Sequence, residues 1–439
     1  MINNYARESN DRDLISLLLR GNEVDIFEVL SGVSEKLSSQ RRCVQGYLES
    51  GEKVYGFSTL LGHLDYISSV AESQTDLFEG HLVGPTSEID EFRFKMISYA
   101  KLAQLANGSS GISPTTFREL SRRTAAWRGP AVGNWHGSYS SGDVVQGAWW
   151  VKNIIGDVVD QRKLPAGDLI AMINGNFVST GTVISLIPKL QEFFSRAIEI
   201  VALMSDSGTF WFQGSIDVGA RSSNETGRKS ALWLADTQPP VSLRDSCPVL
   251  ELIKNTWSRL LGAVRSNLSS ASGNPLFEFQ EEATRAINQS SFLNFGLSQE
   301  LLLAVDSVSR VGAYVQRYIE HFCSMASSRV EGTDKIRFVQ PPKVATGILT
   351  RLSAGYAQAT IPTLSESLGI EDICDESLRR AELLGTSVGL ALELVDIFDS
   401  CLAAAQELDV YSQLCQESGI EPWQVQFFSD SAKASCLPE

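Results

Sequence analysis

The stretch from Ser298 to Ala326 limits the possible folds of this chain most strongly. Its apolar residues recur every three or four positions, which is the period of one helical face. A helix of this length can bury such a face only against other long helices, so the stretch predicts a helical bundle. The face consists of Leu301, Leu302, Leu303, Val305, Val308, Val311, Tyr314, Val315 and Ile319.

Further segments repeat this helical spacing, whereas strand signals are few. Alternating or β-branched residues indicate short strands only at Thr209–Val218 and near Phe338. The fold class predicted from the sequence is therefore mainly α, a long-helix bundle with an irregular N-terminal part. The additional helical segments are 11–48, 184–204, 248–267 and roughly 376–408.

Glycine, serine and proline gather in a few places, which predicts loops there. No repeat or flexible linker divides the chain, so we expect one helical domain over residues 1–439. Within it we distinguish an N-terminal part (about 1–180), a central bundle (about 181–410) and a C-terminal appendage (about 411–439). The predicted loops cover 107–114, 129–142, 205–230 and 268–275.

Composition narrows the possible partners and location. The formal net charge of -15 argues against a nucleic-acid surface, because binding phosphates requires clustered lysine and arginine. No apolar run reaches membrane-spanning length, and the first residues lack the apolar core of a signal peptide. The seven cysteines form no CxxC pair, and no two of the four histidines stand at helical i,i+4 spacing. We expect a cytoplasmic protein with reduced thiols, no metal and no membrane partner.

The loop at Ser140-Ser141-Gly142-Asp143 has a sequence that can undergo backbone chemistry. A glycine nitrogen can attack the carbonyl carbon two residues earlier, after which the intervening serine loses water. The product is a methylidene-imidazolone, an electrophile that ordinary side chains do not supply. The same letters also suit a polar turn.

Six further segments, in order along the chain, resemble loop motifs of one enzyme family. Together with Ser140–Asp143 they are similar to the aromatic amino acid ammonia-lyases and 2,3-aminomutases, which include histidine and phenylalanine ammonia-lyases. The resemblance covers roughly residues 40 to 410 as spaced islands. The six segments are Val54–Gly62, Gly80–Gly84, Ile173–Gly175, Gln238–Arg244, Gly273–Leu276 and Ile370–Asp372.

The resemblance implies a catalytic group and the residues that work with it. Ser140, Ser141 and Gly142 would form 4-methylidene-imidazol-5-one autocatalytically, and Asp143 would assist its formation. Tyr55 would be the base that removes the β-proton. A phenol with a pKa of about 10 can do this near neutrality only if neighbouring dipoles or cations lower that pKa.

The resemblance also implies a set of substrate-binding residues and a homotetramer whose active sites combine loops from neighbouring subunits. Among the binding residues, Arg244 would grip the substrate carboxylate through two parallel hydrogen bonds. Each residue also has an ordinary interpretation, such as a surface ion pair, a turn asparagine or a core histidine. The predicted set is His81, Asn174, Gln238, Arg244, Asn274 and Glu371.

Several positions depart from the family pattern. Ser140 replaces an alanine, Pro239 replaces an aspartate, and Val241 replaces a tyrosine that helps hold the catalytic geometry. Valine can neither donate a hydrogen bond nor release a proton. In place of an Asn-Phe-His segment the chain has Asn288–Phe292, with the aromatic partner of the electrophile lost or displaced.

Three hypotheses follow from these observations. The first is an ammonia-lyase or 2,3-aminomutase acting on an aromatic or related α-amino acid. The second is an enzyme of specialised metabolism on the same scaffold that works without the electrophile, by another elimination, cyclisation or addition. The third is a non-catalytic protein on an inherited scaffold.

Overall fold

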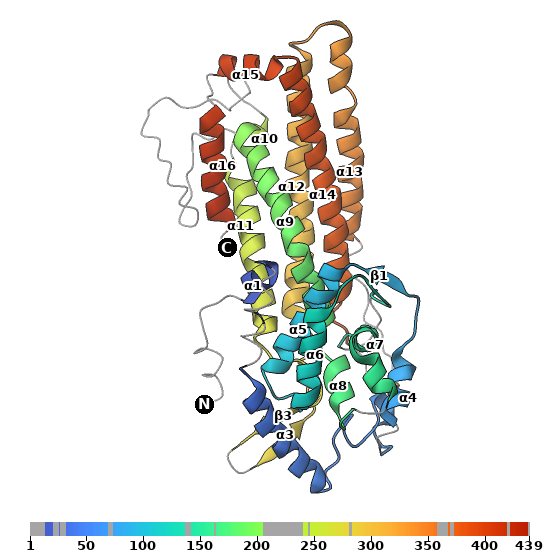
Figure 1. Cartoon of the computed structure of the whole chain (residues 1–439). Coiled ribbons are helices and arrows are strands. Elements are labelled where there is room, and N and C mark those ends of the chain that lie inside the picture. Colours follow the sequence, from blue (N-terminus) through green and yellow to red (C-terminus); the bar gives the residue numbers. More distant parts are fainter. Residues whose placement is uncertain are drawn as a thin grey trace. The chain divides into compact units, whose positions relative to one another are not determined.

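The computed structural model describes most of the chain, and the contacts within it define two compact units (Figure 1). The first unit comprises Met1–Leu186, Gly262–Gln299 and Ile361–Glu382, and the second comprises Ile187–Leu261, Glu300–Thr360 and Leu383–Glu439. The described residues are 14–20, 26, 32–68, 73–136, 142–161, 164–204, 240–244, 246–280, 283–357, 368, 373–418 and 422–437.

The first unit consists of short and medium helices with two small antiparallel ribbons, β1–β2 and β3–β4. Ser87 of β1 pairs with Gly133 of β2, and Leu276 of β3 pairs with Ile287 of β4. The elements are α1 (Leu14–Arg20), α3 (Ser34–Glu49), η1 (Gly62–Leu64), α4 (Ser73–His81), β1 (Ser87–Ile89), α5 (Glu91–Ala106), α6 (Pro114–Ala126), β2 (Ala131–Gly133), α7 (Val144–Asp160), α8 (Asp168–Ile173), β3 (Leu276–Phe279) and β4 (Thr284–Ile287).

Two helical glycines bring backbones of the first unit into direct contact. A Cβ atom on Gly147 of α7 would lie 2.3 Å from the carbonyl oxygen of Ile173 at the end of α8. A Cβ atom on Gly181, in α9 (Phe177–Met204), would lie 2.3 Å from the Cα atom of Ile97 in α5. No side chain fits at either distance, so α7 packs directly on α8, and α9 on α5.

A buried ion pair joins three segments of the same unit. Arg41 of α3 donates hydrogen bonds to the carbonyl oxygens of Gly111 (2.6 Å) and Ala166 (2.9 Å). Its Nη1 atom lies 3.4 Å from a carboxylate oxygen of Asp168, the first residue of α8. That carboxylate also accepts hydrogen bonds from the backbone and hydroxyl of Ser113, which caps α6. The network fixes α8 relative to α3 and α6.

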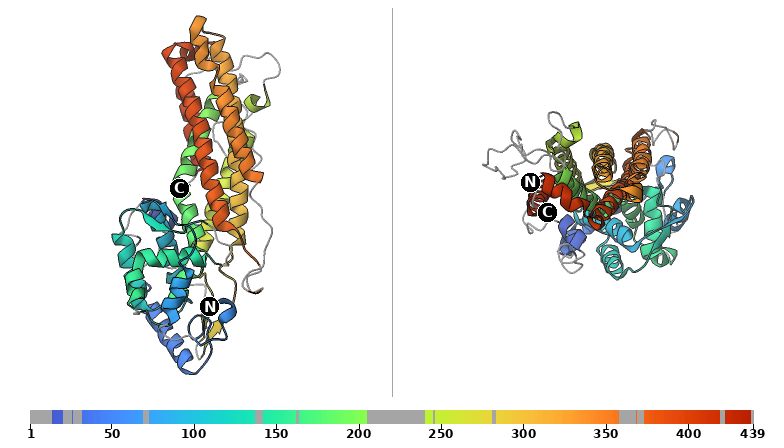
Figure 2. Two further views of the ribbon diagram at one scale, coloured as in Figure 1. Left: turned by 90° about the vertical axis from the view of Figure 1, so that its right-hand side faces the viewer. Right: turned by 90° about the horizontal axis from the view of Figure 1, so that it is seen from above.

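The second unit is a bundle of long helices that run side by side in all the views (Figures 1 and 2). A Cβ atom on Gly312 of α12 would lie 3.1 Å from Leu352 of α13 and 3.3 Å from Leu394 of α14, so these three helices meet closely. Its remaining elements are α10 (Val241–Arg244), α11 (Cys247–Leu268), α12 (Phe295–Ser327), η2 (Gly332–Phe338), α13 (Pro341–Ala357), α14 (Ser377–Glu407), α15 (Val410–Ser418) and α16 (Pro422–Cys436).

The mainly α prediction is confirmed. The helix expected from Ser298 to Ala326 is α12, and the one expected over 376–408 is α14. The strand expected near Phe338 is wrong, because Gly332–Phe338 forms a 3-10 helix. The other expected strand, Thr209–Val218, lies outside the described residues.

Contrary to the expectation that no apolar run reaches membrane-spanning length, the segment Asp168–Met204 contains a window that is long and apolar enough in composition to cross a membrane. However, 83% of that window is buried inside the protein. Such burial is typical of the central helix of a globular unit.

Candidate active site

Gly142 occupies a position that strongly favours glycine. Its φ angle is +90°, in the region that favours glycine. A Cβ atom at this residue would lie 3.0 Å from the Cβ atom of Phe292 and 3.4 Å from the Oδ1 atom of Asn174. The preceding residues of the tripeptide, Ser140 and Ser141, lie outside the described residues.

Asp143 joins the tripeptide to two helices. It caps α7 with a φ angle of +50°, and its carbonyl oxygen accepts a 2.7 Å hydrogen bond from the backbone of Gly147. Its carboxylate accepts a 3.0 Å hydrogen bond from the backbone of Ser179 in α9. Burial, together with the negative charge of Asp375, raises the pKa of Asp143 to about 7, against the opposing effect of the hydrogen bonds from Ser179. The carboxyl group can therefore hold or release a proton near neutral pH.

Asn174 and Gly175 contact the tripeptide from the end of α8. The backbone nitrogen of Gly175 donates a 3.0 Å hydrogen bond to the carbonyl oxygen of Gly142. The Asn174 side chain is only 6% exposed, and among the described residues its Oδ1 atom has no hydrogen-bond donor. Because a buried acceptor without a partner is costly, this oxygen is well suited to bind a donor at the tripeptide.

Lys101 of α5 is a fully buried cation beside this loop, which the sequence analysis missed. Its Nζ atom donates a 2.8 Å hydrogen bond to the carbonyl oxygen of Asn174 and lies 4.7 Å from the ring centroid of Phe177. Burial lowers the pKa of Lys101 to about 7, against the opposing effect of the Asp143 charge. The available signal was a lone lysine in the otherwise largely apolar stretch Met96–Ala106.

The Asn274 loop holds Phe292 in place. The side-chain oxygen of Asn274 accepts a 3.1 Å hydrogen bond from the backbone of Gln289. Ser272 donates a 3.2 Å hydrogen bond to the carbonyl oxygen of Ser291, the residue before Phe292. The aromatic partner expected to be lost or displaced is therefore present, since Phe292 itself contacts Gly142.

The loop that carries Tyr55 packs on α8. A Cβ atom on the adjacent Gly56 would lie 2.8 Å from Ile170, so the loop touches this helix directly. The ring of Phe57 packs edge-on against Phe277, with the ring centroids 5.1 Å apart, in the strand that follows Asn274. The Tyr55 hydroxyl accepts a 2.9 Å hydrogen bond from the backbone of Gly62. These contacts bring the loop beside α8 and the Asn274 segment.

His81 is the last residue of α4, and its Nδ1 atom lies 2.6 Å from the carbonyl oxygen of Leu77 in the same helix. Two residues later, the carbonyl oxygen of Val83 accepts hydrogen bonds from Trp149 of α7 (3.2 Å) and from Asn134 (3.3 Å). The segment after His81 thus lies on the helix that begins at the tripeptide. This hydrogen-bonding contact ties the His81 ring to its own helix, and the role of His81 toward the substrate stays a prediction.

Comparison with known proteins gives these features a family context. Residues 26–159, which include Tyr55, His81 and the tripeptide, match the family model for aromatic amino acid lyases. The MIO-dependent tyrosine 2,3-aminomutase of Streptomyces globisporus is 24% identical over 348 residues. That match covers 63% of this chain and 64% of the relative, which is less than two thirds of the relative's length.

Solved structures share the fold along nearly the whole chain. The tyrosine aminomutase from Streptomyces globisporus superposes with a TM-score of 0.68 at 18% identity and covers 92% of each chain. Phenylalanine aminomutase from Pantoea agglomerans gives 0.71 at 14% identity, covering 93% of this chain and 90% of that one. Histidine ammonia-lyase from Trypanosoma cruzi gives 0.67 at 15% identity, covering 92% and 89%. The chain therefore has the fold of these aminomutases and ammonia-lyases, and its residues 26–159 are similar in sequence to the aromatic amino acid lyases.

The remaining predicted site residues lie elsewhere in the chain. Gln238 and Glu371 are outside the described residues. Arg244 is the last residue of α10 and belongs to the second unit, so its role as a carboxylate clamp stays a prediction. Just after the Glu371 segment, the carboxylate of Asp375 accepts hydrogen bonds from the backbone nitrogens of Asn294 and Ser377. The negative charge of Asp375 also raises the pKa of Asp143.

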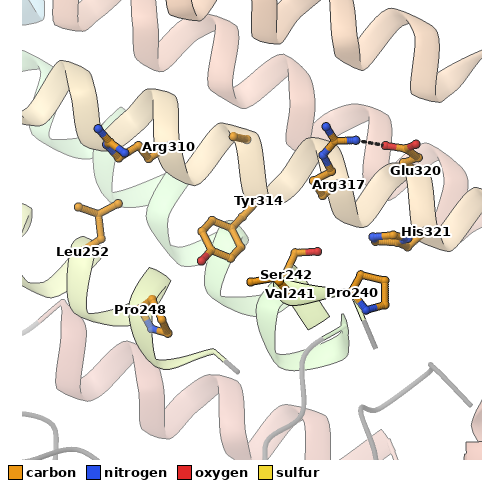
Figure 3. A pocket seen from close by; sticks show the side chains of 11 residues that line it. Pro240, Val241, Ser242, Pro248, Leu252, Arg310, Tyr314, Arg317, Glu320 and His321 are labelled. Atoms are coloured by element: carbon orange, nitrogen blue, oxygen red, sulfur yellow. Dashed lines mark hydrogen bonds and ion pairs between the residues drawn. The ribbon is translucent and has the colours of Figure 1, made fainter. Parts of the chain in front are cut away.

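A pocket of about 720 Å³ lies beside α10 within the second unit (Figure 3). Val241, which replaces the family tyrosine, lines it and is 72% exposed. Tyr314 of α12 lines the same pocket, and Tyr318 donates a 2.9 Å hydrogen bond to the carbonyl oxygen of Ser242. The motif that includes Val241 and Arg244 therefore borders an open cavity.

Proposed function

We propose that this protein is an ammonia-lyase or 2,3-aminomutase that acts on an aromatic or related α-amino acid. The observation that carries the proposal is the setting of Gly142, which has a positive φ angle and packs so closely on Phe292 that a side chain would be crowded there. This glycine directly follows two serines and precedes a buried carboxyl group. The family model and the tyrosine 2,3-aminomutase relative support the same reading.

The residues around Gly142 fit 4-methylidene-imidazol-5-one formed from Ser140, Ser141 and Gly142. Phe292 covers one side of Gly142, and the backbone of Gly175 binds its carbonyl oxygen. The nearby Asn174 Oδ1 atom is buried and has no donor in the described part of the chain. When formed, the group supplies an electrophile that takes up the substrate amine and turns it into a better leaving group.

The other residues would move protons and bind the substrate. Asp143, with its pKa raised to about 7, can take or give a proton during ring formation near neutrality. Tyr55 would remove the β-proton, and Arg244 would bind the carboxylate. His81, Asn174, Gln238, Asn274 and Glu371 would contact the rest of the amino acid.

Quaternary structure is part of the proposal. We expect a homotetramer in which loops from neighbouring subunits complete each active site. The location of Arg244 in a different compact unit from Tyr55 and Gly142 is compatible with such a shared site. We expect the protein to act in the cytoplasm on a free amino acid.

One observation supports a second candidate, an enzyme of the same scaffold that works without the electrophile. The family tyrosine is replaced by the exposed Val241, which cannot exchange a proton. Another elimination, cyclisation or addition would then replace deamination. A non-catalytic scaffold protein is the remaining alternative.

Intact mass spectrometry tests the first proposal directly. We expect the purified protein to weigh less than its sequence by two water molecules, and a Ser141→Ala variant to lack the ring. The protein is then incubated with tyrosine, phenylalanine and histidine while ammonia, the unsaturated acid and the β-amino acid are measured. A protein of full sequence mass that still turns over an amino acid would support the electrophile-free enzyme, and one that is linear and inert would support the scaffold protein.

A further inference from the structure

Lys101 occupies an unusual place for a lysine. It lies in the middle of α5, with no exposed surface, and the hydrogen-bond partner of its Nζ atom is a backbone carbonyl oxygen. Burying an ammonium group costs several kcal/mol unless its surroundings compensate for the lost water. Such a cost suggests that the buried lysine has a role beyond filling space in the core.

The carbonyl that Lys101 contacts belongs to the peptide group that holds the tripeptide. Lys101 donates a 2.8 Å hydrogen bond to the carbonyl oxygen of Asn174. The nitrogen of the same peptide group, that of Gly175, donates a 3.0 Å hydrogen bond to the carbonyl oxygen of Gly142. When the Lys101 amine is protonated, its charge on the oxygen of this peptide group polarises the group, which strengthens the hydrogen bond that the nitrogen donates.

The same peptide group is held tightly on its other sides. Gly175 has a φ angle of +142°, where other residues are strained. A Cβ atom there would lie 3.3 Å from the carbonyl oxygen of Ser272 and 3.4 Å from the Nζ atom of Lys101. The position of Lys101 therefore determines where the Gly175 nitrogen points.

We propose that Lys101 is a positioning residue for ring closure: through the Asn174–Gly175 peptide group it holds Gly142, whose nitrogen attacks the carbonyl carbon of Ser140. The inference rests on the proposed function. In the closure, a bond forms between the Gly142 nitrogen and the Ser140 carbon. The Ser140 oxygen leaves as water with the amide protons of Ser141 and Gly142. A second water takes the Ser141 hydroxyl and its α-proton, so no oxidant is needed and Lys101 contributes no atoms.

The charge of Asp143 also acts on Lys101 and opposes the effect of burial on the pKa of the lysine. Lys101 could therefore serve only as a counter-ion that stabilises the folded chain. The two roles differ in what they predict. A counter-ion affects stability alone, whereas a positioning residue changes the rate of ring closure in molecules that are already folded.

The test compares Lys101→Met and Lys101→Gln with the wild-type chain. Each full-length protein is made by cell-free translation, synthesis is stopped, and the folded fraction from size-exclusion chromatography is weighed by intact mass spectrometry over time. We expect Lys101→Met to close about tenfold more slowly, the factor that corresponds to loss of one charged hydrogen bond. Lys101→Gln, which keeps a donor without the charge, should close at an intermediate rate. Circular dichroism and the thermal midpoint are measured on the same fractions.

A matched control is Lys152→Met, because Lys152 lies on α7 and its amine forms an exposed ion pair with Asp160. This variant should close at the wild-type rate. Closure of folded Lys101→Met at the wild-type rate would overturn the inference and leave the proposed function intact. A wild-type chain that never loses two waters would overturn the proposed function itself, and this inference with it. Failure of both Lys101 variants to fold would assign the lysine to stability and also overturn the inference.

Discussion

Phe292 lies directly against Gly142, so close that a Cβ atom on the glycine would be 3.0 Å from the Cβ atom of the phenylalanine. The two residues are far apart in the sequence, and the hydrogen bonds of the Asn274 loop with Gln289 and Ser291 bring them together. An aromatic ring thus contacts the tripeptide on which the proposed chemistry depends. Substitutions at either residue therefore test whether the contact is needed for ring formation.

Gly142→Ala should destabilise the fold and prevent ring closure. Alanine at a φ angle of +90° is strained, and its methyl group would lie only 3.0 Å from the Cβ atom of Phe292, so that Phe292 would have to move slightly. We expect a loss of roughly 1–3 kcal/mol in the free energy of unfolding, measured by urea denaturation, and a full sequence mass. The matched control is Gly262→Ala, in an open position on α11, which should stabilise the helix by about 0.5–1 kcal/mol. Equal effects of the two changes would contradict the strained setting of Gly142.

Phe292→Ala should reduce the share of molecules that lose two waters, because Gly142 loses the side chain that packs on it. Because the phenylalanine is half-buried, we also expect the free energy of unfolding to fall by roughly 2 kcal/mol, about half the loss for a fully buried phenylalanine. Phe295→Ala removes an exposed ring three residues further along and should leave the intact mass unchanged. If Phe292→Ala closed as completely as this control, the contact would have no part in forming the ring.

Tyr55→Phe tests the proposed base. The change removes one oxygen and leaves the packing of the Gly56–Phe57 loop on its neighbours intact. With an amino acid that the wild-type protein deaminates, we expect ammonia release to slow by roughly 10²–10⁴-fold at an unchanged intact mass. Tyr66→Phe, at an exposed position of the same region, should release ammonia at the wild-type rate. Full activity of Tyr55→Phe would transfer the role of base to another residue.

Arg41→Met should strongly destabilise the first unit, because it leaves the carboxyl group of Asp168 buried without its cation. Burial already raises the pKa of Asp168, and the charge of Arg41 opposes that rise. Removing one partner of a buried ion pair typically costs about 3–5 kcal/mol, which urea denaturation can detect. Arg122→Met removes an exposed arginine of α6 and should leave the denaturation midpoint unchanged. Two variants of equal stability would show that the buried network contributes little.

Lys101→Met should change how stability depends on pH. In the folded protein the pKa of Lys101 is lowered from 10.5 to about 7, chiefly by burial. Between these values the unfolded chain binds a proton that the folded chain does not, so this lysine makes the wild-type protein more stable as pH rises, by at most about 1.4 kcal/mol per pH unit. The variant should lose that slope in denaturation series between pH 7 and 10, and Lys152→Met should keep it.

The effect of Asp143 on stability has the opposite sign and a different pH window. Its pKa is raised in the folded protein from 3.8 to about 7, so the folded chain binds the extra proton and stability falls as pH rises across that range. Comparing each variant with the wild type at the same pH separates the two groups. A difference between wild type and Lys101→Met that does not vary above pH 7 would rule out a titrating amine there.

The long helices were predictable because their signal is local and repeats many times. The apolar spacing over Ser298–Ala326 is enough to place α12, and the same holds for α14. The two β ribbons escaped prediction, since strands of three or four residues carry little periodic signal. A strand was wrongly expected near Phe338 for the same reason, because the 3-10 helix at Gly332–Phe338 is also too short to carry a clear periodic signal.

The candidate site was predictable only where the residues themselves carry the chemistry. Ser140, Ser141, Gly142 and Asp143 stand together in the sequence, and Tyr55 and Asn174 lie in motifs that can be read from their letters. Lys101 lies outside such motifs, and Phe292 belongs to a segment, Asn288–Phe292, that departs from the family pattern. Each acquires its place through a contact with a distant part of the chain, Lys101 with Asn174 and Phe292 with Gly142.

The amino-acid sequence by itself thus determined a helical protein, the type of helix that builds it and the tripeptide that can close into a ring. Only the tertiary structure decided that a buried lysine holds the peptide group bound to Gly142, that a phenylalanine packs against Gly142 and that the neighbouring carboxyl group has a pKa near neutrality. The physical reason is the separation along the sequence of the residues that interact. Helical periodicity depends on residues three or four positions apart, whereas burial, close packing and altered proton affinity arise when segments distant in sequence exclude water together.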